Sequence, residues 1–158
     1  MINDFKIFNG GEVKPNSWPW MVRMMTDWNG LCGGTVLNKN WIITAASCCD
    51  EGYIDYLPYF VIGDHTPDTY DGTEQVVRVR ATFIHPKYEQ VHDYNDDNAD
   101  DFRYNYDVCL NQVADINFDE IGADIACLPD QGIHISPNDI SMEPDCMEPY
   151  CMVVQTGK

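Results

Sequence analysis

Residues 41–52 read WIITAASCCDEG, and this stretch decides the fold that the sequence predicts. The run 41–45 is apolar and rich in β-branched side chains, which is typical of a buried strand. Ser47 and two adjacent cysteines follow this strand directly. We therefore expect a buried strand that delivers Ser47 to the edge of the core, and the question is what chemistry a serine can perform there.

The composition describes one acidic globular domain. The 158 residues are 44% hydrophobic, and nine basic against 26 acidic residues give a net charge of −17. A surface this negative repels phosphate backbones and anionic lipid headgroups, so we expect neither nucleic acid nor a membrane as a partner. No apolar run is long enough to span a bilayer, and residues 1–6 lack the basic and apolar segments of a signal peptide.

Seven cysteines indicate an oxidising compartment, because disulfides persist only there. We therefore expect a secreted protein. The odd count leaves at least one cysteine that is either unbridged or joined to something outside the chain. A zinc site is disfavoured, because the adjacent Cys48 and Cys49 lack the usual ligand spacing.

Short β-rich runs separated by turn signals predict an all-β fold without helices. Val77, Val79 and Ala81 alternate with Arg78 and Arg80, which favours a strand with one packed face and one wet face. Six such strands can close one barrel. The predicted strands are residues 21–25, 34–37, 41–45, 59–63, 76–84 and 108–113. Five aspartates in residues 93–101 predict a solvated loop, and residues 136–149 are predicted to be a linker.

Five motifs in a fixed order resemble the N-terminal half of a chymotrypsin/trypsin-like serine protease domain. They are KIFNGGEVKPNSWPWMV (6–22), LCGGTVLNKNWIITAASC (31–48), GDHTPDTYDGTEQ (63–75), FIHPKYE (83–89) and YDVCLNQV (106–113). The resemblance implies the first of that family's two six-stranded Greek-key β-barrels, with the second barrel missing from these residues. It divides the chain into an activation-peptide remnant (1–6), the barrel (7–135) and an inter-barrel linker with the start of the second barrel (136–158).

The resemblance also assigns catalytic positions. Asp107, in YDVCL, matches the family's triad acid, but Ser47 stands where the family has the histidine base. An alcohol is no general base near neutral pH, because proton transfer needs a group whose pKa lies close to the working pH. We expect His65, His85, His92 and His134 to be surface or locally bonded histidines. The family's nucleophile lies in a G-D-S-G-G turn, which these 158 residues do not contain.

Two further features follow from the resemblance. Lys6 and Ile7 are similar to the family's activation cleavage junction, although a lone exposed lysine before a strand is an equally good interpretation. Cys32 and Cys48 match a family disulfide, and closing 16 residues contributes about 3 kcal/mol in the loop-entropy model. The pairing of the other cysteines stays open, and a bridge between Cys146 and Cys151 is one possibility. These cysteines are Cys49, Cys109, Cys127, Cys146 and Cys151.

A calcium loop is the one candidate site that keeps its full set of ligand positions. In the trypsins the corresponding segment wraps a calcium ion, which places carboxylates on Asp64, Asp71 and Glu74 and carbonyls on Thr66 and Thr69. Asp64 departs from this pattern, because the calcium-binding relatives carry the longer glutamate there. The alternative is an acidic hairpin loop without a metal.

Two functions from different classes remain. The first is a serine protease homologue without catalysis, a pseudoprotease that acts by protein binding or regulation. The second is a fragment of a secreted serine endopeptidase. In either case we expect a protein partner, which the acidic surface predicts to be basic, or self-association through the inter-barrel face that a lone barrel exposes.

Overall fold

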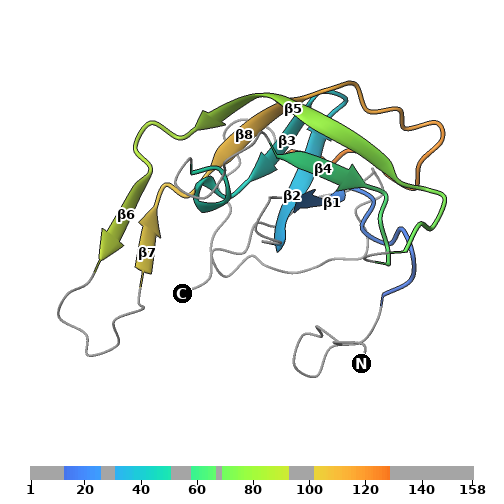
Figure 1. The fold of residues 1–158 in the computed structure, drawn as a ribbon, viewed down its shortest axis with the longest axis horizontal. Coiled ribbons are helices and arrows are strands. Elements are labelled where there is room, and N and C mark those ends of the chain that lie inside the picture. The colour runs from blue at the N-terminus through green and yellow to red at the C-terminus, as the bar shows by residue number, and fades with distance from the viewer. Residues whose placement is uncertain (1–12, 26–30, 51–57, 67–68, 93–101, 129–158) are drawn as a thin grey trace.

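The computed structural model describes residues 13–25, 31–50, 58–66, 69–92 and 102–128. The regular secondary structure of this part of the chain is almost entirely β-strand (Figure 1). The strands are β1 Met21–Met25, β2 Leu31–Asn38, β3 Trp41–Thr44, β4 Tyr59–Ile62, β5 Gln75–Ile84, β6 Glu89–His92, β7 Phe102–Asn105 and β8 Cys109–Val113. In these ranges the helical structure is one 3-10 turn, η1 (Ala46–Cys48), and no helix has the length and apolar character needed to cross a bilayer.

Six of the strands close a barrel in the order β1-β2-β3-β8-β5-β4, and every neighbouring pair is antiparallel. The order is a Greek key, because β8 returns to lie between β3 and β5 instead of beside the strand that precedes it in the chain. Each of the six predicted runs overlaps one barrel strand. The predicted all-β, six-stranded Greek-key barrel is confirmed.

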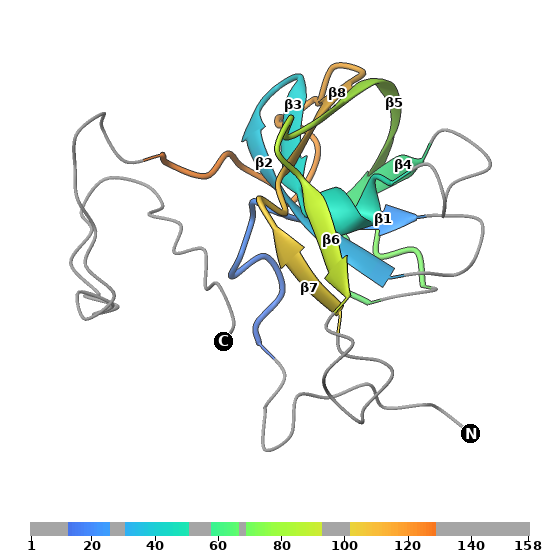
Figure 2. The ribbon, with the colours of Figure 1, turned by 90° about the vertical axis from the view of Figure 1, so that its left-hand side faces the viewer.

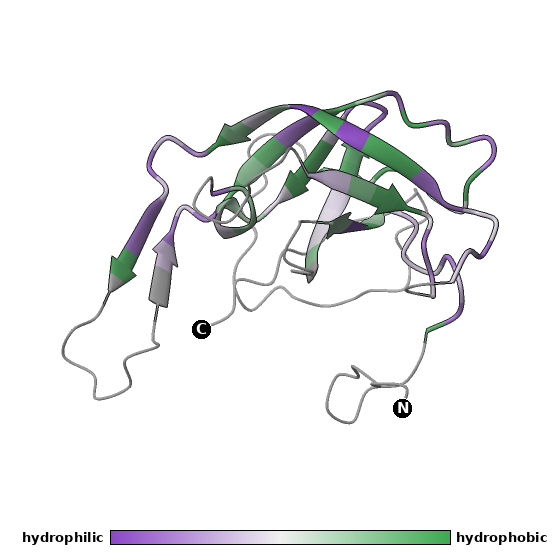
Figure 3. Cartoon of the chain, viewed as in Figure 1, coloured by the Kyte–Doolittle hydropathy of each residue, from purple (hydrophilic) through white to green (hydrophobic). Residues whose placement is uncertain are grey.

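The barrel core follows from the alternation of side chains along the strands. On β5, Val77 and Val79 are buried while the intervening Arg78 and Arg80 are exposed, and Figure 3 shows this alternation in colour. A strand directs successive side chains to opposite faces, so the apolar set of each strand meets inside the barrel. The buried core consists of Val22, Met24, Val36, Ile42, Phe60, Ile62, Val77, Val79, Val113 and Ile116.

Strands β6 and β7 form a separate two-stranded antiparallel sheet, which extends away from the barrel in Figures 1 and 2. The sequence analysis did not predict these two strands. The aspartate-rich residues 93–101 between them lie outside the described residues, as do the proposed cleavage junction Lys6–Ile7 and the linker. The boundaries at residues 1–6 and 136–158 therefore stay predictions.

Candidate active-site edge and acidic loop

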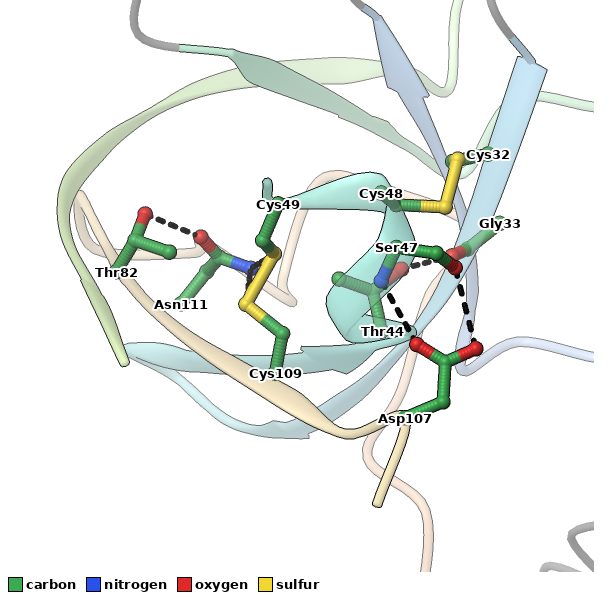
Figure 4. The surroundings of a disulfide bond; sticks show 10 residues. All are labelled: Cys32, Gly33, Thr44, Ser47, Cys48, Cys49, Thr82, Asp107, Cys109 and Asn111. Atoms are coloured by element: carbon green, nitrogen blue, oxygen red, sulfur yellow. Dashed lines mark hydrogen bonds between the residues drawn. A yellow bond between two sulfur atoms is a disulfide. The ribbon is translucent and has the colours of Figure 1, made fainter. Parts of the chain in front are cut away.

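Ser47 is held at the point where β3 ends and the chain turns through η1 (Figure 4). The hydroxyl of Thr44, the last residue of β3, donates to the carbonyl of Gly33 at 2.6 Å and ties this end to β2. The backbone N–H of Cys48 donates to the carbonyl of Ala45 at 3.1 Å, which closes the turn. Ala46, the first residue of η1, is fully buried and anchors the turn in the core, so the turn fixes Ser47 at a half-buried edge.

Asp107 reaches the same edge from the segment before β8. The β3–β8 register pairs Thr44 with Cys109, so the residues just past the end of β3 face those just before β8. Tyr106 has a φ of 52°, in the left-handed region that non-glycine residues seldom adopt. The N–H of Val108 donates to the carbonyl of Tyr106 at 2.7 Å, and this tight turn directs Asp107 towards η1.

Both carboxylate oxygens of Asp107 accept hydrogen bonds from Ser47. The Ser47 N–H donates to Oδ1 at 2.7 Å, and the Ser47 hydroxyl donates to Oδ2 at 3.1 Å (Figure 4). The structure therefore brings together the two residues that the sequence assigned to the acid and base positions. The serine acts as a hydrogen-bond donor to the carboxylate, and its hydroxyl has no basicity near neutral pH.

The histidines of the described residues have local contacts. The His85 ring stacks on Tyr106, with centroids 4.9 Å apart, and its Nδ1 accepts the N–H of Lys87 at 3.1 Å. The backbone N–H of His65 donates to the carboxylate of Asp71 at 3.2 Å. The side chain of His92 and all of His134 lie outside the described residues.

Two disulfides flank η1. Cys32–Cys48 joins β2 to the end of η1, as in the predicted pair, and Cys49–Cys109 joins the next residue to β8. The amide Nδ2 of the fully buried Asn111 donates to the sulfurs of both Cys49 and Cys109 at 3.5 Å. The sequence analysis left the second pairing open. The sequence did contain one signal for it: one cysteine, Cys49, lies two positions after Ser47, and another, Cys109, lies two positions after Asp107.

The predicted calcium loop brings its three carboxylates together. Ligand oxygens of Asp64, Asp71 and Glu74 all lie within 4.8 Å of one another. The carbonyl of Thr66 accepts the N–H of Thr69 at 3.1 Å, and the carboxylate of Asp71 accepts the N–H of Thr66 at 2.8 Å. The loop is therefore cross-linked by its own hydrogen bonds, and the calcium site stays a prediction.

Glu74 closes the loop from inside. Its carboxylate accepts the backbone N–H groups of Asp71, Gly72 at 2.9 Å and Thr73 at 3.1 Å. Desolvation acts to raise the pKa of Glu74, but the backbone hydrogen bonds outweigh it and hold the pKa below its ordinary value. Glu74 is consequently ionised under all but acidic conditions.

Comparison with known proteins gives a consistent result. The protein-family model described as Trypsin matches residues 7–133. Chymotrypsin-like elastase family member 1 from Homo sapiens is 31% identical over 139 residues, which are 84% of this chain and 48% of that protein. The Rattus norvegicus counterpart is 29% identical over 137 residues, 84% of this chain and 47% of the relative. Kallikrein-8 from Homo sapiens is 34% identical over 110 residues, 70% of this chain and 37% of the relative. The chain spans about half the length of the elastase relatives that it matches.

Proposed function

This chain belongs to the trypsin family of serine proteases, and from that premise we propose that it is a non-catalytic member, a pseudoprotease that acts by binding another protein. The observation that carries the proposal is the contact between Ser47 and Asp107. A serine stands at the base position and donates two hydrogen bonds to the carboxylate that orients a histidine in an active member.

The chemical argument concerns the proton of the attacking group. A serine nucleophile becomes reactive when a neighbouring imidazole removes its proton, and the carboxylate then stabilises the charged imidazole. With Ser47 at that position, Asp107 contacts a group whose hydroxyl cannot accept the proton near neutral pH. Loss of the triad histidine in a comparable enzyme costs about a millionfold in rate.

The alternative is that these residues are one part of a serine endopeptidase. The chain corresponds to 47–48% of the length of the elastase relatives, a share that is compatible with this alternative but does not favour it. A nucleophile supplied elsewhere would still meet Ser47 instead of an imidazole, so the non-catalytic interpretation has more support.

The charge and the exposed apolar side chains indicate protein partners. The net charge of −17 favours a basic partner and opposes binding to nucleic acid or anionic membranes. Two disulfides are typical of an oxidising compartment, so we propose that the protein is secreted.

Large apolar side chains that are more than half exposed include Met21, Tyr70, Val76, Phe83 and Leu128. Self-association is a second proposal, which a monomeric mass in light scattering, without binding of a hydrophobic dye, would contradict.

The proposed lack of catalysis is tested with fluorogenic peptides of varied P1 residue. An active trypsin-family protease serves as the positive control, and the S47A variant controls for a contaminating protease. We expect hydrolysis by the wild-type protein and by S47A to equal that of buffer. Turnover by the wild-type protein that S47A abolishes would show that Ser47 takes part in catalysis and would refute the proposal.

A further inference from the structure

Arg23 lies on β1 and reaches the acidic loop between β4 and β5, of which the structure describes residues 63–66 and 69–74. The register pairs Arg23 with Val61, and Asp64 is three residues beyond that position. The Nε of Arg23 donates to Oδ2 of Asp64 at 2.7 Å, and its Nη2 forms an ion pair with the same oxygen. The exposed fractions of the two side chains are 21% for Arg23 and 6% for Asp64. The sequence analysis missed this contact between residues 41 positions apart.

A carboxylate as deeply buried as that of Asp64 needs a counter-charge, because burying an unpaired ion is very costly. The negative charge in the loop is larger still, since the carboxylates of Asp71 and Glu74 converge on Asp64. The guanidinium of Arg23 supplies a fixed positive charge, because arginine does not lose its proton in proteins. Two donors of its planar fork, Nε and Nη2, converge on one carboxylate oxygen, Oδ2 of Asp64.

The base of the loop is closed by contacts that involve no ion. Gly63 has a φ of 71°, and a Cβ there would lie 2.3 Å from the carbonyl oxygen of Thr73, so only glycine fits this position. The hydroxyl of Thr73 donates to the carbonyl of Gly63 at 3.0 Å. Backbone N–H groups of the loop also donate to the carboxylates of Asp71 and Glu74. These contacts within the chain hold the described part of the loop in its conformation.

We infer that Arg23 is the resident cation of this loop: its guanidinium neutralises Asp64 in place of a calcium ion, and the loop keeps its conformation without metal. The residues present disagree with calcium on two counts. The oxygen Oδ2 of Asp64 is already bound by Arg23, and the guanidinium charge repels a divalent cation from the same cluster.

The test compares thermal unfolding in EDTA and in calcium chloride, with terbium luminescence as a second probe of metal binding. The variant is R23Q, and R78Q is the matched control, because Arg78 is an exposed arginine on the outer face of β5. We expect the wild-type midpoint to be the same in EDTA and calcium. R23Q is expected to melt about 5 °C or more below R78Q in EDTA, and to bind terbium at least about tenfold more tightly than the wild-type protein.

Two results would overturn the inference. One is stabilisation of the wild-type protein by calcium, with saturable terbium binding that R23Q does not strengthen. The other is an R23Q protein as stable in EDTA as R78Q, since Asp64 would then not depend on Arg23. If R23Q fails to fold, R23K is used, because it keeps the positive charge and loses the fork of donors. The inference is then supported if R23K folds with a lowered unfolding midpoint and calcium leaves the wild-type midpoint unchanged.

Discussion

Removal of the Cys49–Cys109 disulfide is expected to be the most destabilising disulfide loss in the described part of the chain. The bridge spans 60 residues, against 16 for Cys32–Cys48. In the loop-entropy model these lengths correspond to about 4 and about 3 kcal/mol at 25 °C.

The surroundings of the longer bridge enlarge the difference. Asn111 is fully buried, and its amide donates to both sulfurs while its carbonyl accepts the hydroxyl of Thr82 at 2.8 Å. In C49A/C109A the amide N–H groups lose these acceptors, which adds about 1–3 kcal/mol for an unsatisfied buried donor. The expected total is about 5–7 kcal/mol, comparable with the whole stability of a small domain.

The assay is urea denaturation without reductant, on the wild-type protein, C49A/C109A and C32A/C48A. Peptide mapping under the same conditions verifies that the remaining bridge is intact. We expect C49A/C109A to lose more stability than C32A/C48A. Equal losses, or a larger loss in C32A/C48A, would refute the argument from loop length and from Asn111.

Three further predictions concern the active-site edge, the core and the loop. D107A leaves the Ser47 N–H without its acceptor and is expected to cost about 1–3 kcal/mol, more than S47A, which removes one hydrogen bond; urea midpoints that rank S47A as the worse variant would contradict this. I42A empties a fully buried position and is expected to cost about 2–5 kcal/mol, measured by the same method. In the folded protein the pKa of Glu74 lies below its ordinary value of 4.5. Ionised Glu74 therefore stabilises the fold above that pH, and this stabilisation is lost as the pH falls through the lowered pKa. Between about pH 5 and about pH 3, E74Q is therefore expected to lose less stability than the wild-type protein, and an equal loss in both would contradict the role of Glu74.

The sequence predicted the barrel because its strands carry their burial in the side-chain pattern. The alternation of Val77 and Val79 with Arg78 and Arg80 marks one packed face, and that face is the one the barrel buries. Strands β6 and β7 escaped prediction because they are four residues long and largely polar. Among the side chains that the structure describes on these strands, Glu89, Gln90 and Tyr104 are exposed, so they offer no apolar alternation to mark a strand.

The residues of the candidate site that belong to a sequence motif could be predicted. The contacts that depend only on how the strands are arranged in the fold could not. Ser47 and Asp107 were assigned by motif, and the β3–β8 register brings them together. The Cys49–Cys109 bridge and the Arg23–Asp64 pair join residues 60 and 41 positions apart. Local patterns carry no information about such partners, because strand order decides which segments meet.

The central claim, that no group at the base position can activate a serine, is tested most directly by intact-mass spectrometry after treatment with a fluorophosphonate. The protein used is the complete natural gene product, with an active trypsin-family protease treated in parallel. We predict that the mass of this protein stays unchanged while the control gains one adduct. A stoichiometric adduct that forms as fast as in the control would contradict the account.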